Sequence, residues 1–144
     1  MSNSAFITNL ARIEVPEGNV FHAMKKSSNG YSGFGEAYFS KIKFGSIKGW
    51  KRHKNMILNI IVPVGEIKFV IYDDRDPSSK EFQEFIISCE NYCRLTVPPM
   101  LWLGFQGLAE EESMLLNIAN IEHDPNEVDR LDVDMINYNW GFIS

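Results

Sequence analysis

Residues 45–65 read Gly-Ser-Ile-Lys-Gly-Trp-Lys-Arg-His-Lys-Asn-Met-Ile-Leu-Asn-Ile-Ile-Val-Pro-Val-Gly, and this stretch decides the fold class. A glycine stands at each end of it. Residues 46–53 and the strongly apolar, β-branched residues 56–64 are typical of two successive β-strands. Lys51 and His53 are two residues apart, so strand geometry places both side chains on one face. The stretch therefore predicts a pair of strands with two basic groups on the same side.

The flanking sequence continues as short strands separated by turn residues. We expect further strands at 37–44, 66–72, 92–97, 102–105 and 114–121. Residues 79–88 fit a helical face about as well as an irregular strand, so both interpretations stay open. Residues 123–136 are expected to wrap the surface or to form one short helix. Many short strands with little helix predict an all-β protein, and a jelly-roll barrel in particular.

The composition is that of one globular domain of 144 residues, with 44% hydrophobic and 23% charged residues. A formal charge of -5 argues against nucleic acid as a partner. No run of 18 apolar residues occurs and the N-terminal stretch does not resemble a secretory signal, so we expect no membrane partner. Cys89 and Cys93 are too few for a disulfide framework and indicate reduced thiols in a cytoplasmic protein.

The spacing within the first stretch resembles the first motif of the cupin family. Cupins place two histidines and a glutamate at fixed intervals between two glycines. Here Gly45 and Gly65 keep the interval, His53 keeps the second histidine position, and Lys51 and Leu58 replace the first histidine and the glutamate. The resemblance implies a cupin-type barrel whose interior face carries Lys51 and His53.

Residues 98–103 have the length of the second cupin motif, with Met100 in place of its glycine and Leu103 in place of its histidine. Of the four usual metal ligands only His53 remains. A catalytic divalent metal needs about three protein ligands. We therefore predict that the chain binds no metal, and we expect no other cofactor.

The wider sequence resembles the sugar-nucleotide epimerases of the dTDP-4-dehydrorhamnose 3,5-epimerase type and the related sugar 3,4-ketoisomerases. The similar segments occur in the family's order, at 47–54, 65–75, 97–105, 121–127 and 138–140. The resemblance implies one cupin domain over residues 1–144, divided into an N-terminal arm (1–34), a barrel core (35–121) and a C-terminal segment (122–144).

The resemblance also implies an activity. We expect an isomerase that epimerises a dTDP-linked or other NDP-linked 4-keto-6-deoxy sugar at C3, C5 or both. Its chemistry would be proton abstraction and enolate formation, in the biosynthesis of deoxysugars and surface polysaccharides such as lipopolysaccharide. Two alternatives stay open: a 3,4-ketoisomerase on the same substrate class, and a catalytically silent cupin that binds a sugar nucleotide.

The candidate catalytic residues are His53 and Lys51. A proton next to a ketone needs a base of matched pKa, and a positive group must stabilise the enolate oxygen. Imidazole suits the base role and the Lys51 ammonium suits the oxygen, although the two roles could be exchanged. The family's tyrosine acid should fall near residues 117–121, where no tyrosine occurs, and Tyr72 and Tyr138 are the remaining candidates.

The candidate substrate-binding residues lie in or near the predicted strands, and they are Lys48, Arg52, Arg75, Trp102, Asn117 and Asn120. Lys48 and Arg52 belong to a basic segment that suits a phosphate, although simple alternation points both outward or places them at a strand end. Trp102 could stack on the base, and Asn117 or Asn120 could bind sugar hydroxyls. We also expect a homodimer that covers exposed strand edges through residues 5–7 and 34–39.

Overall fold

The chain is described by a computed structural model over residues 4–141. Its first sheet contains β1 (Phe6–Asn9), β4 (Glu36–Ile42), β6 (Leu58–Val64), β9 (Cys93–Val97) and β11 (Ser113–Ala119). Its second sheet contains β5 (Ile47–His53), β7 (Glu66–Asp73), β8 (Glu81–Ser88), β10 (Trp102–Gly107) and β12 (Val128–Leu131). Each sheet is antiparallel, with the strand orders β1-β9-β6-β11-β4 and β12-β5-β10-β7-β8. This arrangement confirms the predicted all-β, cupin-type jelly roll.

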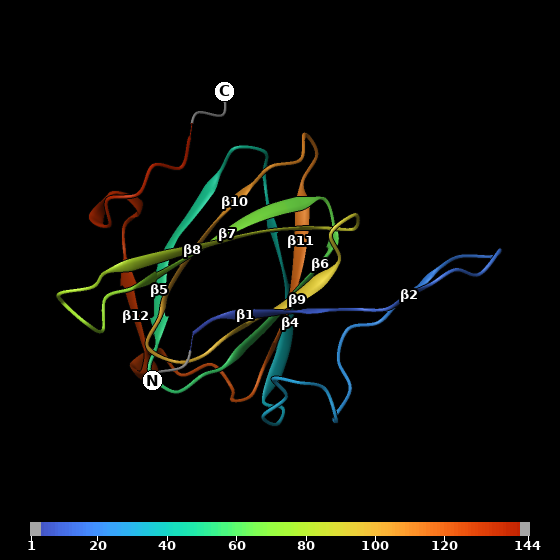
Figure 1. Cartoon of the computed structure of the whole chain (residues 1–144), viewed down its shortest axis with the longest axis horizontal. Helices are drawn as coiled ribbons and strands as arrows, with labels where there is room; N and C mark the ends of the chain where they lie inside the picture. Colours follow the sequence, from blue (N-terminus) through green and yellow to red (C-terminus); the bar gives the residue numbers. More distant parts are fainter. Residues whose placement is uncertain (1–3, 142–144) are drawn as a thin grey trace.

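The remaining elements are short. Strands β2 (Arg12–Ile13) and β3 (Val20–Phe21) form a two-stranded ribbon, and Figure 1 shows it projecting away from the two sheets. Two 3₁₀ helices, η1 (Pro125–Glu127) and η2 (Val133–Met135), flank β12. Neither they nor any other part of residues 4–141 offers a helix long and apolar enough to cross a bilayer.

The main core lies between the sheets. Val62 of β6 and Phe69 of β7 have no exposed surface, and Leu95 of β9 is likewise fully buried. Buried and half-buried residues alternate along β11, whereas β9 is buried along its whole length. Burying each large apolar side chain contributes about 1.5–3 kcal/mol. The two inner faces therefore hold the sheets together and enclose the interior of the barrel.

A second apolar cluster covers the outer face of the second sheet. Trp50 of β5 packs against Trp140 with 5.6 Å between ring centroids, and Val70, Trp102 and Ile136 complete the cluster. The C-terminal segment thus lies over the outside of β5, β7 and β10. Because these contacts use the outward side chains of β5, the inward side chains are left to the barrel interior.

The two glycines that bound residues 45–65 adopt a left-handed backbone conformation, which favours glycine. Gly45 and Gly65 have φ values of 76° and 85°, in the left-handed region. A Cβ at Gly65 would lie 2.2 Å from Oγ of Ser113, so no larger residue fits there without a shift. Met100, which replaces the glycine of the second motif, keeps a φ of 72°. The turns between strands are therefore those that the sequence spacing implied.

The structure settles one open prediction from the sequence and differs from another. Residues 81–88 form strand β8, paired along its whole length with β7, which settles the open choice for residues 79–88. Residues 123–136 do more than wrap the surface, because β12 extends the second sheet by pairing with β5. That pairing was not visible in the sequence, since β12 is only four residues long.

Candidate functional site

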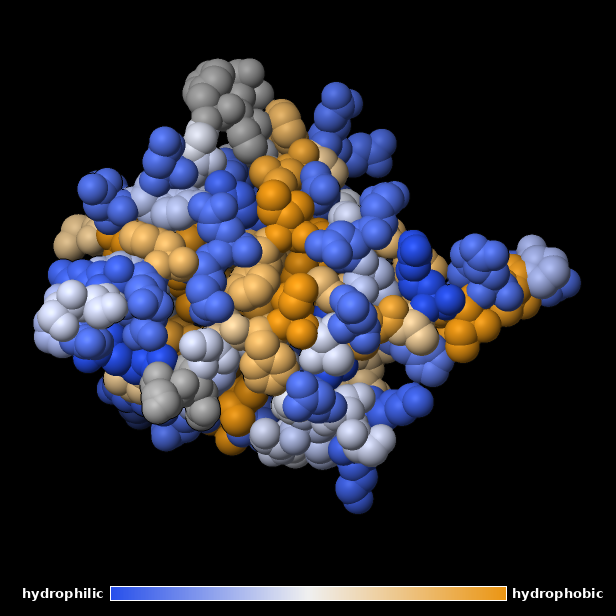
Figure 2. Space-filling model, in the orientation of Figure 1, coloured by the Kyte–Doolittle hydropathy of each residue, from blue (hydrophilic) through white to orange (hydrophobic). Residues whose placement is uncertain are grey.

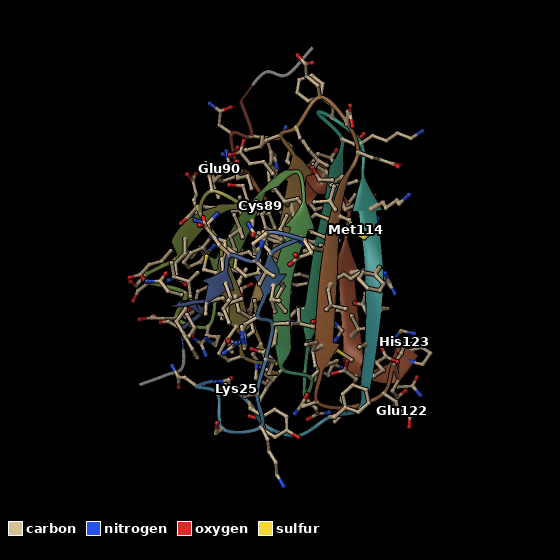
Figure 3. All side chains as sticks on the ribbon, turned by 90° about the vertical axis from the view of Figure 1, so that its right-hand side faces the viewer. Lys25, Cys89, Glu90, Met114, Glu122 and His123 are labelled. Atoms are coloured by element: carbon tan, nitrogen blue, oxygen red, sulfur yellow. The ribbon has the colours of Figure 1, made fainter. Side chains whose placement is uncertain are left out.

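A cavity of about 640 Å³ lies between the inner faces of the two sheets. Its apolar wall comes from inward side chains of the three strands β6, β10 and β11, namely Leu58, Ile60, Leu103, Phe105 and Leu115. A second cavity of about 270 Å³ shares Tyr38, Lys51, His53 and Arg130 with the first, and His123 also lines it. Figure 3 shows His123 and Glu122 at one end of the barrel and Cys89 toward the other end. The predicted pair Lys51 and His53 therefore faces an interior cavity.

His53 is held by a buried carboxylate. Its Nδ1 lies 2.5 Å from Oε1 of Glu127, which η1 places at the end of β5. The two side chains are only 12% and 5% exposed. A carboxylate can only accept, so this hydrogen bond selects the tautomer with the proton on Nδ1 and the lone pair on Nε2. His53 is thereby oriented to exchange a proton through Nε2.

The Glu127 carboxylate is itself fixed by the backbone. Its Oε2 accepts hydrogen bonds from the N–H groups of Lys54, Asn55 and Met56 at 3.1, 3.0 and 3.2 Å. Burial alone would raise the pKa of Glu127, but the hydrogen bonds from His53, Asn55 and Met56 outweigh it and lower that pKa. Glu127 is therefore an anion at neutral pH, and its orientation and that of the imidazole are set together.

A bulge in β5 brings a second lysine to the cavity. Leu103 pairs with Lys51 and Phe105 with Lys48, so three steps along β5 match two along β10. Lys48 consequently lies on the same face as Lys51, where simple alternation had pointed it outward. Its Nζ donates to Oγ of Ser40 at 2.9 Å and lies 5.8 Å from the centroid of the Phe105 ring.

Arg130 supplies a third cation. It pairs with Lys51 across β12 and β5, and directly paired residues share a face of the sheet. Partial burial, the charge of Arg130 and the charge of Lys48, in that order of size, lower the pKa of Lys51. Among the residues that line the main cavity, Asp132 is the acidic side chain. The cavity is therefore positively charged and suits an anionic ligand.

Tyr38 lies across the cavity from this group. It belongs to β4 of the first sheet, whereas Lys51 and His53 belong to β5 of the second. Its Oη accepts a hydrogen bond from Nδ2 of Asn117 at 3.2 Å, which leaves the phenolic proton available to a ligand. Oδ1 of Asn117 accepts from the backbone N–H of Asn59 at 3.2 Å, which fixes the amide orientation.

The structure brings four of the eight sequence-based candidates together in the cavity: Lys48, Lys51, His53 and Asn117. Arg52 and Trp102 pair with each other on the outer face, where the guanidinium lies 4.6 Å from the indole centroid and donates to Asp129 at 2.9 Å. Trp102 also donates through Nε1 to Asp74 at 3.2 Å. Strand alternation explains the outward position of both side chains, because Arg52 is adjacent to the inward Lys51 on β5 and Trp102 is adjacent to the inward Leu103 on β10.

The other two candidates, Arg75 and Asn120, make structural contacts. Arg75 follows β7 and donates to both carboxylate oxygens of Asp73, at 2.9 and 2.8 Å. Oδ1 of Asn120 accepts from the backbone N–H of Ile57 at 2.7 Å, which fixes the turn between β5 and β6. Neither residue lines the two cavities that contain His53.

Sequence reasoning missed Tyr38, Glu127 and Arg130. Glu127 occurs in a segment that resembles the epimerase family, which was the available signal for it. Tyr38 has the parity of Ser40 on a predicted strand, but nothing local marked that face as the interior. The tyrosines that the sequence offered lie elsewhere: Tyr72 packs on Phe82 with 4.6 Å between centroids, and Tyr138 donates to Glu84.

No group of three or more His, Cys, Asp or Glu side chains within residues 4–141 is arranged to hold a metal ion. The imidazole of His53 is already engaged with Glu127, and its cavity neighbours Lys48, Lys51 and Arg130 are cations. Such a donor set does not suit a divalent metal.

Known proteins resemble this chain in fold and in sequence. The dTDP sugar isomerase of Desulfovibrio desulfuricans G20 has a TM-score of 0.86 and 34% identity, covering 90% of this chain and 85% of that chain. The dTDP-4-dehydrorhamnose 3,5-epimerase of Bacillus anthracis strain Ames has a TM-score of 0.81 at 20% identity, with coverage of 97% and 86%. At that identity the second likeness supports the fold alone.

Among curated proteins, the probable low-salt glycan biosynthesis epimerase Agl13 of Haloferax volcanii is 32% identical over 96 residues, or 65% of this chain. The matched part spans 62% of the length of that relative. No family model matches the chain.

The fold defines a cupin-type jelly roll with a cavity between its two sheets. Within that class, the chain belongs to the family of dTDP-4-dehydrorhamnose 3,5-epimerase-like sugar-nucleotide epimerases and isomerases.

Proposed function

We propose that this chain is an epimerase of a nucleotide-linked 4-keto-6-deoxy sugar, acting at C3, C5 or both in the synthesis of deoxysugars and surface polysaccharides. One observation carries the proposal. His53, fixed by Glu127, and Tyr38 line the same cavity from opposite sheets. Inversion of a carbon next to a ketone requires a base on one face of the sugar and a proton donor on the other. This cavity offers both.

In the first step, Nε2 of His53 would remove the proton next to the ketone. The electron pair moves into the bond to the carbonyl carbon, and negative charge develops at the ketone oxygen. A fixed positive group at that oxygen lowers the barrier, and loss of one such group typically costs 10²–10³-fold in rate. Lys51 lies two residues from His53 on the same face and is placed to act at the carbonyl.

In the second step, Tyr38 would return a proton from the opposite face. Its hydroxyl accepts from Asn117, so its own proton points to another acceptor. Asn117 thus positions the acid and is no longer needed to bind sugar hydroxyls. The Tyr38 phenolate would then recover a proton from solvent, and the His53 imidazolium would release one to solvent, which restores both groups.

The nucleotide diphosphate would lie against the cations at the cavity wall. Lys48 and Arg130 flank Lys51 there, and charge-assisted hydrogen bonds to phosphate are stronger than neutral ones. Arg52 and Trp102, on the outer face, are not part of this proposed site. The similarity to the dTDP sugar isomerase of Desulfovibrio desulfuricans supports a dTDP-linked sugar as the substrate class.

The experiment is to incubate the protein with dTDP-4-keto-6-deoxyglucose in D₂O and to follow the sugar by NMR. Deuterium at C5 supports epimerisation and excludes a pure 3,4-ketoisomerase, whereas a 3-keto product identifies the ketoisomerase. Tight binding by calorimetry without label at any carbon would identify a silent cupin and contradict the proposal.

We also propose that the chain works as a homodimer in the cytoplasm. Phe34 and Phe39 are each 65% exposed beside the edge strand β4, and Ile7 on the edge strand β1 is 42% exposed. The projecting ribbon carries further exposed apolar atoms from Ile13 and Val20, and Figure 2 shows apolar surface along it. Light scattering at micromolar concentration should give twice the chain mass.

The free thiols Cys89 and Cys93 would stay reduced in the cytoplasm.

A further inference from the structure

Within residues 4–141 the Lys51 amine forms no ion pair and no side-chain hydrogen bond. Asp132 and Glu36 line the two cavities that Lys51 faces, but neither forms an ion pair with it. Glu127 is engaged with His53 and three backbone N–H groups. A lysine in the wall of a cavity is normally paired, because an ammonium is strongly hydrated. Lys51 instead faces the open cavity beside His53.

Its charged neighbours make the ammonium form less favourable. Arg130 is paired with Lys51 on β12, and the bulge in β5 turns Lys48 to the same side. Partial burial and then these two charges lower the pKa of Lys51, so a larger share of the amine is neutral than for an ordinary lysine. Leu58 and Leu103 belong to the apolar wall of the cavity and contribute to this partial burial, while Lys51 as a whole stays exposed to the cavity.

As an ammonium, Lys51 would stabilise the ketone oxygen; as a neutral amine next to two cations, it would instead attack the carbonyl carbon. Lysines desolvated in an apolar pocket or placed next to another cation react with carbonyl groups to form Schiff bases. Resting on the proposed function, we propose that Lys51 forms a Schiff base with the 4-keto group of the sugar, and that epimerisation proceeds through an enamine.

The step balances with residues already in the cavity. The lone pair of Nζ attacks the carbonyl carbon, and the π electrons move to oxygen, which takes a proton. The carbinolamine then loses that oxygen as water and becomes a protonated imine. Removal of the neighbouring C–H proton sends its electron pair toward the imine nitrogen and gives the enamine.

The same residues complete the cycle. Reprotonation of the carbon restores the imine, and attack of one water molecule returns the ketone and the free amine. His53 and Tyr38 line the same cavity and carry the protons. No oxidant or reductant is required, because a carbon–oxygen bond is exchanged for a carbon–nitrogen bond and then restored.

The test is reductive trapping. The protein is incubated with dTDP-4-keto-6-deoxyglucose and sodium cyanoborohydride at neutral pH, where the reagent reduces an imine in preference to a ketone. Imine formation releases one water and reduction adds two hydrogens, so the intact mass should increase by one sugar nucleotide less one oxygen atom. Peptide mapping should place the adduct on Lys51. Lys51→Arg keeps the charge but forms no stable imine. It should give no adduct and should lower deuterium exchange at least about a hundredfold, as far as Lys51→Met does.

The outcomes separate the two proposals. If the wild type exchanges deuterium but gives no adduct, or gives one on Lys48, the Schiff base is overturned and the epimerase proposal stands. The same holds if Lys51→Arg keeps exchange within tenfold of the wild type, because charge alone then suffices. If the wild type neither exchanges deuterium nor forms an adduct, both proposals fail.

Discussion

Nδ1 of His53 lies 2.5 Å from Oε1 of Glu127, although 74 residues separate the two in the chain. The contact depends on β12, which pairs with β5 and brings η1 to the end of that strand. The C-terminal segment therefore does more than cover the outer face of the sheet. It supplies the carboxylate that fixes the candidate base.

Glu127→Gln tests this positioning role. The amide keeps one acceptor but loses the negative charge, so the imidazolium that forms after proton abstraction is less stabilised. We expect kcat to fall about a hundredfold with KM nearly unchanged, and Glu127→Asp to recover part of the loss. Asp129→Asn is the matched control, since Asp129 pairs with Arg52 on the outer face. An equal loss in that control, or a change confined to KM, would contradict the role.

The same variant should change stability in a pH-dependent way. The pKa of Glu127 is lowered in the folded chain, so its contribution is fully present above the unfolded pKa of about 4.3 and is lost as pH falls through the folded value. Glu127→Gln should therefore reduce the free energy of unfolding by about 1–3 kcal/mol at pH 7, and by less at pH 3. Urea unfolding at the two pH values measures the difference.

Tyr38→Phe separates proton removal from inversion. His53 can still take a proton and return a deuteron to the same face, so deuterium should enter the sugar at a rate within about tenfold of the wild type. Formation of the inverted product should fall about a hundredfold, because the opposite face has lost its acid. NMR measures both rates in one sample. Tyr72→Phe is the control, since Tyr72 packs on Phe82. Equal loss of exchange and inversion in Tyr38→Phe would show that Tyr38 is not the acid.

Lys51→Met should slow exchange at least about a hundredfold and yet stabilise the fold. The pKa of Lys51 is lowered in the folded chain, so the ammonium destabilises it at neutral pH, and this effect disappears above the unfolded pKa of about 10.4. Because the side chain is exposed to the cavity, we expect a gain of only about 0.5 kcal/mol at pH 7. A variant less stable than the wild type at pH 7, measured by urea unfolding, would contradict the account of the cation cluster.

Chelation should leave the activity unchanged. The described residues offer no cluster of three metal-binding side chains, and His53 is paired with Glu127. Deuterium exchange measured after dialysis against EDTA should equal that of the untreated protein. Elemental analysis of the purified protein should find no stoichiometric Zn, Fe, Mn or Ni. Loss of exchange with EDTA, restored by added Zn²⁺ or Fe²⁺, would refute the prediction.

The sequence predicted the fold well because its signal is local. Period-two alternation and bounding glycines mark β5, β6 and β7, and the structure has all three within two residues of the predicted limits. Residues 79–88 stayed ambiguous because β8 is an edge strand. Its apolar residues Phe82 and Ile86 are 40% and 46% exposed, so the apolar residues of the segment do not mark one buried face.

The site was predicted only where alternation is regular. Lys51 and His53 share a face because they are two residues apart, and both line the cavity. Lys48 could not be placed, since one extra residue in β5 reverses its direction and leaves no mark in the sequence. Glu127 and Tyr38 come from distant segments, and their approach depends on pairing between strands that composition does not specify.

The most direct measurement compares wild type and His53→Asn for deuterium exchange into dTDP-4-keto-6-deoxyglucose. Asparagine can still hydrogen-bond to Glu127 but cannot act as a base at neutral pH. The account predicts that exchange is lost, while calorimetry shows nucleotide binding within about tenfold of the wild type, or roughly 1.4 kcal/mol. Exchange at the wild-type rate in His53→Asn would place the base elsewhere and contradict the central claim.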